Sequence, residues 1–140
     1  MSIGADAPID RPRVTAPLVV AIGASAGGLS ALRDFFGAAT GDPRIAYVVV
    51  THLPAHHISH LAELLGRTGV LPSREVREGD VLSGGQVHVM PPARWMALRG
   101  GLVHFEHPAP SKAPAPKPID FFMSSLAQQV ADRCVGIVLS

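Results

Sequence analysis

A serine set among glycines is the residue of this chain whose surroundings best suit chemistry. Ser25 lies in the run Gly23-Ala-Ser-Ala-Gly27, which satisfies the G-x-S-x-G pattern of a nucleophile elbow. A serine hydroxyl is a poor nucleophile alone and needs a base to take its proton. His52 is the best candidate for that base, because it closely follows the next apolar run, 45–50. Together the two residues indicate acyl transfer through serine.

Other interpretations of these residues stay open. Ser25 could only cap the helix that follows it, since serine is a preferred N-cap residue. The glycines Gly23, Gly27 and Gly28 permit a sharp turn and a close approach of backbone to a ligand, as in a phosphate loop. The spacing does not give G-x-G-x-x-G, however, and no clear acidic residue closes a second strand. His52 could only hydrogen-bond a loop.

A metal site and an orienting carboxylate are both weakly indicated. His56 and His60 are one helical turn apart, with His57 beside them, but Glu63 is the only close acid. A polar helix face is therefore the favoured interpretation, and we expect no metal and no cofactor. The acids that could orient a catalytic imidazole are Asp42, Glu63, Glu75, Glu78, Asp80, Glu106, Asp120 and Asp132. None follows a parallel strand convincingly, and Asp120 best fits the first turn of a helix.

Strands and helices alternate along the chain as in a parallel sheet. Apolar runs predict strands at 18–22, 45–50 and 134–140, with shorter strands at 74–76 and 86–90. Helices are expected at 28–39, from about 58, and from 118 onward, and Gly100-Gly101 predicts an antiparallel hairpin of 95–98 with 102–105. We predict an α/β fold, a doubly wound, mostly parallel, Rossmann-like sheet with an inserted hairpin. Ser25 and His52 would share the rim where strands end, if their strands are neighbours.

Composition bounds the class of protein. The 140 residues allow one domain, and 47% hydrophobic residues suffice for a core. We expect residues 1–16 to be a disordered leader, 17–140 the domain, and the proline-rich stretch 108–118 an exposed loop. The net charge is +1 and the basic residues are scattered, so the sequence lacks the basic patch typical of a nucleic-acid-binding protein. The lone Cys134, with no signal peptide or membrane span in view, predicts a cytoplasmic protein without membrane insertion.

Five segments resemble the catalytic domain of the chemotaxis protein-glutamate methylesterases, the CheB family. They are Val20–Gly28, Thr51–Pro54, Gln86–Pro92, Lys117–Ala127 and Gly136–Ser140. They occur in the family's order and cover about residues 18–140. The sequences Leu61-Ala-Glu-Leu-Leu65 and Pro91-Pro92 most resemble those of the variant fused to a CheR-type methyltransferase domain.

The resemblance implies that Ser25 is the nucleophile, His52 the general base, and the backbone N–H of Ala26 an oxyanion donor. It implies hydrolysis of glutamyl methyl esters on the cytoplasmic region of methyl-accepting chemotaxis receptors, with a fused or separate methyltransferase as a further partner. The family's third catalytic residue is an aspartate in a loop after the strand that 135–140 matches. We therefore expect a domain incomplete at its C-terminus, weakly active or inactive, with an apolar sheet edge that invites self-association. The alternative is a degenerate, non-catalytic regulatory or docking module of the same fold.

Overall fold

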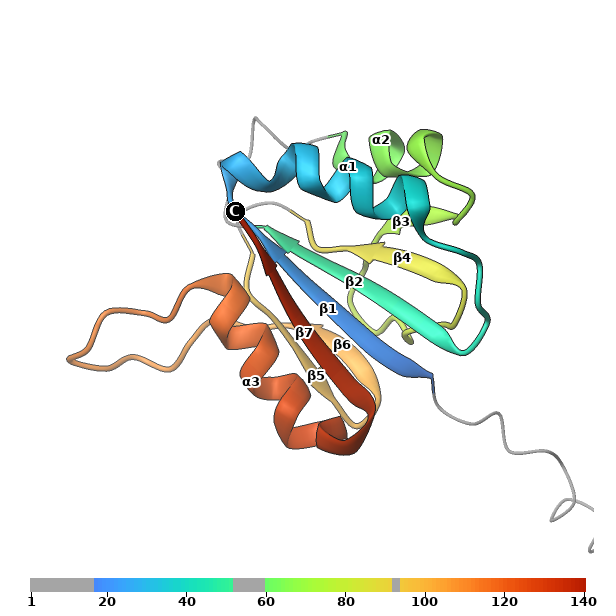
Figure 1. The fold of residues 1–140 in the computed structure, drawn as a ribbon. Helices are drawn as coiled ribbons and strands as arrows, with labels where there is room; N and C mark the ends of the chain where they lie inside the picture. The colour runs from blue at the N-terminus through green and yellow to red at the C-terminus, as the bar shows by residue number, and fades with distance from the viewer. Residues whose placement is uncertain (1–16, 52–59, 92–93) are drawn as a thin grey trace, which may run out of the picture.

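The computed structural model describes residues 17–51, 60–91 and 94–140, which form a five-stranded sheet with a hairpin beside it (Figure 1). The strands are β1 (Leu18–Ala24), β2 (Ile45–Thr51), β3 (Ser73–Glu75), β4 (Gln86–Val89) and β7 (Cys134–Leu139). Their order is β3-β4-β2-β1-β7, and every neighbouring pair is parallel. The two central strands, β1 and β2, are buried along their whole length after the first residue, as expected of apolar runs covered on both faces.

The two faces of the sheet carry different layers (Figure 1). Helices α1 (Leu29–Ala38) and α2 (Leu61–Thr68) cover one face, where Phe36 packs edge-on against Tyr47 with ring centroids 5.4 Å apart. Helix α3 (Pro118–Val130) covers the other face, together with the antiparallel hairpin of β5 (Met96–Arg99) and β6 (Leu102–Phe105). Side chains of β1 alternate between the two cores, so that Ile22 enters the first and Ala21 the second.

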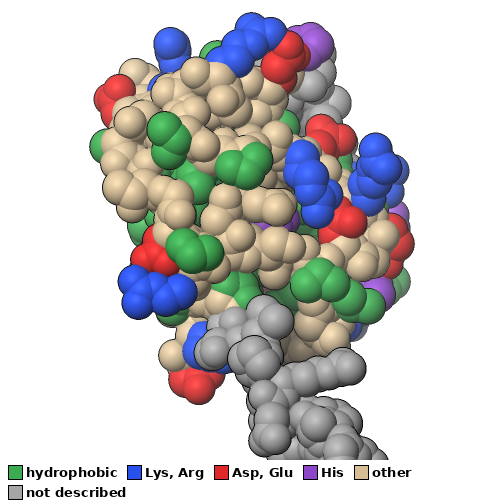
Figure 2. Space-filling model, turned by 90° about the vertical axis from the view of Figure 1, so that its right-hand side faces the viewer, with side chains coloured by type: hydrophobic (Ala, Val, Ile, Leu, Met, Phe, Trp, Pro, Cys, Tyr) green, Lys and Arg blue, Asp and Glu red, His purple; other side chains and the backbone are tan. Residues whose placement is uncertain are grey.

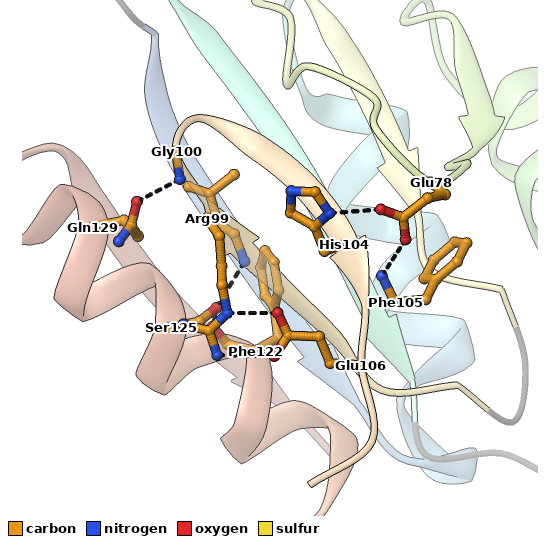
Figure 3. A network of polar contacts seen from close by, with 10 residues as sticks. Glu78, Arg99, Gly100, His104, Phe105, Glu106, Phe122, Ser125 and Gln129 are labelled. Carbon is orange, nitrogen blue, oxygen red and sulfur yellow. Dashed lines mark hydrogen bonds and ion pairs between the residues drawn. The ribbon is translucent and has the colours of Figure 1, made fainter.

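Polar contacts fasten the hairpin to its neighbours (Figure 3). The buried Ser125 hydroxyl of α3 accepts the Leu98 N–H at 3.0 Å and donates to the Phe122 carbonyl at 2.8 Å. On the other side, the Glu78 carboxylate accepts the Phe105 N–H at 2.7 Å and contacts the His104 ring at 2.5 Å. The Phe105 N–H and then the His104 ring lower the pKa of Glu78. Both edges of the hairpin are therefore held in place.

The structure confirms the predicted α/β class, the mostly parallel sheet and the inserted hairpin. The strand expected at 18–22 continues to Ala24, and the one at 74–76 lies one residue earlier, at Ser73–Glu75. The stretch 107–117 contains no helix or strand and is exposed except at Pro108. The leader predicted at 1–16 lies outside the described residues. No helix in the described ranges is long and apolar enough to cross a membrane.

Candidate active site

Ser25 stands where β1 ends and a helical segment begins. It precedes a 3₁₀ turn, Ala26–Gly28, which leads directly into α1. Its backbone is extended, with φ −85° and ψ 178°, and its side chain is exposed. Ser25 occupies the N-cap position of the 3₁₀ turn, but its hydroxyl makes no capping hydrogen bond, so the structure gives no support to a role in capping alone. The sheet edge thus presents a hydroxyl that the helix does not use.

Backbone hydrogen bonds tie this turn to the last strand. The Ser25 N–H donates to the Leu139 carbonyl of β7 at 3.3 Å, and the Gly28 N–H donates to the Ser25 carbonyl at 2.8 Å. Figure 1 shows the end of β7 beside the start of α1. The Ala26 N–H belongs to the first turn of the helical segment, where backbone donors lack helical carbonyl partners. Such a donor, directly after a nucleophile, is suited to bind an oxyanion.

The glycines around Ser25 serve close packing of the chain against itself. Gly23, Gly27 and Gly28 are not among the described glycines with positive φ, so the turn needs no left-handed backbone at them. A Cβ at Gly28 would lie 2.8 Å from the Leu139 carbonyl oxygen, and a Cβ at Gly23 would lie 2.6 Å from Cγ2 of Ile119. The sequence predicted that these glycines allow a ligand to approach the backbone. In the structure Gly28 instead allows the close approach of β7, and Gly23 that of α3.

The register of the sheet brings together the two strand ends predicted to bear the catalytic pair. Ala24 of β1 is paired with Thr51 of β2, and these residues directly precede Ser25 and His52 in sequence. The two strands therefore end side by side at one edge of the sheet. His52 falls in the segment 52–59, outside the described residues, and its role stays a prediction.

Thr51 is a polar residue at this edge that the sequence analysis missed. It is 3% exposed, and its hydroxyl has no hydrogen-bond partner within the described ranges. A buried hydroxyl left without a partner costs free energy. The signal was present in the sequence, because a threonine ends an otherwise apolar strand.

Most of the acidic candidates are held in ion pairs. Asp42 pairs with Arg44, Glu63 with Arg67, Asp80 with Arg74, Glu106 with Arg99, and Asp132 with Arg133, while Glu78 contacts the His104 ring. Asp120 lies in the first turn of α3, as expected. The exposed His60 ring is 3.8 Å from Glu63, while His56 and His57 lie outside the described residues. No group of three or more potential metal-ligating side chains occurs within 17–51, 60–91 and 94–140.

Two hollows of the surface lie away from Ser25. One, of about 480 Å³, is mainly apolar and is lined by residues that include Val19, Leu98 and Arg133. The other, of about 490 Å³, lies around Arg74 and Asp80. Ser25 lines neither of these two hollows.

Comparison with known proteins gives a consistent result. The family model described as CheB methylesterase matches residues 20–140. The protein-glutamate methylesterase/protein-glutamine glutaminase 1 of Myxococcus xanthus is 32% identical over 89% of this chain and 37% of its own length. The similarly named proteins of Treponema pallidum and Maricaulis maris are 30% and 34% identical, over 87% and 92% of this chain and 31% and 33% of their own lengths. The chain thus spans about a third of these relatives.

A solved structure also resembles this fold. The CheB methylesterase catalytic domain of Thermotoga maritima superposes with a TM-score of 0.74 at 25% sequence identity. The match covers 87% of this chain and 66% of that domain.

Proposed function

We propose that this chain, which belongs to the CheB methylesterase family, is the nucleophile-bearing part of a protein-glutamate methylesterase. The observation that carries the proposal is that β1 and β2 end side by side, with Ala24 paired to Thr51. Ser25, whose hydroxyl makes no capping hydrogen bond, follows Ala24, and His52 follows Thr51 in the sequence. A serine and a histidine from neighbouring strand ends are the minimum needed for acyl transfer. The names of the relatives give the class of substrate.

The reaction begins when Ser25 Oγ attacks the γ-carbonyl carbon of a glutamyl methyl ester. His52 takes the hydroxyl proton and passes it to the departing methoxide, so that methanol leaves and an acyl-serine remains. The negative charge on the carbonyl oxygen is bound by the Ala26 N–H. Water, activated by His52, then attacks the acyl-serine, which releases the glutamate carboxylate and restores the Ser25 hydroxyl.

The same chemistry accommodates glutamine. The printed names of the relatives pair the methylesterase with a protein-glutamine glutaminase. A glutaminyl side chain offers the same γ-carbonyl, with ammonia as the leaving group in place of methanol. We therefore propose both activities at Ser25, on the cytoplasmic helices of chemotaxis receptors. A methyltransferase, fused or separate, is the class of enzyme that supplies the ester.

Methanol and ammonia release tests this function. Membranes that carry esterified receptor are incubated with the protein and with a Ser25→Ala variant. We expect slow methanol release from the first and none above background with the second, because the nucleophile is gone. Equal release by both proteins would contradict the proposal. Receptor binding that survives in both proteins without any methanol release would favour the non-catalytic docking module.

A further inference from the structure

The loop between β6 and α3 is basic and proline-rich, and we call its residues 107–117 the basic arm. The arm contains His107, Lys112 and Lys117 and four prolines, but no acidic residue. All of it is exposed except Pro108. Figure 1 shows it projecting from the molecule on the side of α3. Closely spaced prolines favour extended, semi-rigid backbone, so the arm holds its charges away from the core.

Trp95 fixes the base of the arm at both ends. Its indole N–H donates to the Pro116 carbonyl at 2.8 Å, and its own carbonyl accepts the Glu106 N–H at 3.0 Å. The His107 ring lies 6.2 Å from the indole ring, centroid to centroid. Through its backbone and its side chain, Trp95 thus contacts both Glu106, just before the arm, and Pro116, near the end of the arm, which limits the movement of the two ends of the arm relative to each other.

The C-terminal end of the arm lies beside β1, the strand that Ser25 follows. Lys117 is the N-cap residue of α3, and two residues later Ile119 packs against Gly23 of β1. Gly23 in turn is two residues before Ser25. The C-terminal end of the arm is thereby anchored to the strand that leads to the candidate nucleophile, although Lys117 and Ser25 are about 90 positions apart in the sequence.

The positive charge of this region is not neutralised by described carboxylates. Within the described ranges, Arg94, Lys112 and Lys117 form no ion pair, and the Arg94 guanidinium lies 5.1 Å from the centre of the Phe105 ring. The adjacent Glu106 is bound by Arg99, and Asp120 lies in the first turn of α3. The face drawn in Figure 2 differs, because basic and acidic side chains there lie next to one another.

We propose that the basic arm docks the polypeptide that carries the ester, an acidic helical segment. This inference rests on the proposed function. A segment whose glutamates are only partly esterified keeps free carboxylates, which Lys112, Lys117 and Arg94 would attract toward the strand ends that hold Ser25. Two lysines and one arginine suit a few carboxylates of a peptide better than the long phosphate track of a nucleic acid.

Trp95 supplies a direct assay, because it is the only tryptophan of the chain. A helical glutamate-rich peptide is titrated into the protein while the indole emission is recorded, with a glutamine-substituted peptide as a control. We expect a saturable change with the glutamate peptide that weakens as salt rises, and no change with the glutamine peptide. The Lys112→Glu, Lys117→Glu double variant should weaken binding by about tenfold or more. The double variant Arg33→Glu, Arg77→Glu changes net charge equally at exposed sites outside the arm and should bind normally.

Failure of this inference is distinguishable from failure of the proposed function. With an esterified peptide, the arm variant should raise KM and leave hydrolysis of a small ester such as p-nitrophenyl acetate unchanged. Equal binding by both double variants, or preference for a DNA oligomer over the glutamate peptide, would overturn the docking role even if Ser25 hydrolyses the small ester. Arm-dependent binding of the glutamate peptide without any ester hydrolysis would uphold docking and count against the enzyme.

Discussion

Gly27 and Gly28, the two glycines that follow Ser25, show how much a single missing side chain controls where β1 ends. Gly28 lies against the Leu139 carbonyl of β7, the same carbonyl that accepts the Ser25 N–H. Gly27 is in the same turn, but a Cβ there would meet only the Ser140 carbonyl carbon at 3.6 Å, an ordinary contact. The turn therefore offers one glycine that must stay small and one that need not.

Substitution of these two glycines by alanine should separate packing from flexibility. We expect Gly28→Ala to destabilise the protein by about 1–3 kcal/mol, because the backbone of β7 cannot yield to a methyl group 2.8 Å away. Gly27→Ala should be neutral or slightly stabilising, because it lowers the entropy of the unfolded chain. Urea unfolding of both variants checks this. Equal stability of the two variants would show that the approach of β7 does not matter.

The positions and contacts of individual residues were only partly predictable from the sequence. The position of Ser25 at a strand end followed from a local pattern, since apolar residues precede it and helical spacing follows. The partners of Gly23 and Gly28 did not follow, because Ile119 and Leu139 are about 100 residues further along the chain. The role of His52 remains a prediction from resemblance.

At the scale of elements, a buried histidine joins β4 to its surroundings. His88 is fully buried; its Nδ1 contacts the Tyr47 carbonyl of β2 at 2.8 Å, and the Ser83 N–H donates to its Nε2 at 3.1 Å. Only a neutral ring with its proton on Nδ1 satisfies both contacts. Burial lowers the pKa of His88, an effect that the Tyr47 carbonyl opposes; the nearby charges are Arg74, which lowers it further, and Asp80, which raises it.

The lowered pKa of His88 predicts a loss of stability in mild acid. Above its ordinary pKa of 6.5 the ring is neutral in both folded and unfolded chains. As pH falls below that value, the unfolded chain takes up a proton first, so the free energy of unfolding decreases by up to about 1.4 kcal/mol per pH unit. Urea unfolding between about pH 7 and pH 5 measures the slope. His88→Gln should flatten it, whereas the exposed His107→Gln should keep it; a slope unchanged by His88→Gln would contradict the assignment.

Elements with strong local patterns were predicted best. Both central strands, α3 and the hairpin were placed within about two residues, because continuous apolar runs, the Pro118 start and the Gly100-Gly101 turn are local signals. The 3₁₀ turn Ala26–Gly28 was not predicted, since the local sequence pattern does not distinguish it from the start of α1 and its neighbour β7 lies far along the chain.

At the scale of the whole molecule, the sheet has an exposed apolar edge. Strand β7 pairs with β1 on one side, and no described strand pairs with its other side. Val135 and Val138 of β7 are 45% and 72% exposed. An open strand edge with apolar side chains is a template for association with another chain.

A lysine on this edge should reduce self-association of the chain. Val138→Lys places a charge on the exposed strand, where pairing with another chain would have to bury it. Val70→Lys is a matched control, because Val70 is 79% exposed and lies between α2 and β3, outside any strand. Sedimentation velocity over a range of concentrations should show less association for Val138→Lys alone. An equal effect of the two lysines would mean that general charge, rather than the β7 edge, governs association.

Covalent labelling shows whether Ser25 is the nucleophile of this protein. The protein is treated with a serine-directed fluorophosphonate, and the adduct is located by peptide mass spectrometry. We predict one adduct, on Ser25, that is absent from Ser25→Ala and forms more slowly in His52→Ala, because the hydroxyl needs its base. No adduct at Ser25, or labelling that persists in Ser25→Ala, would contradict the claim that this strand end carries the reaction.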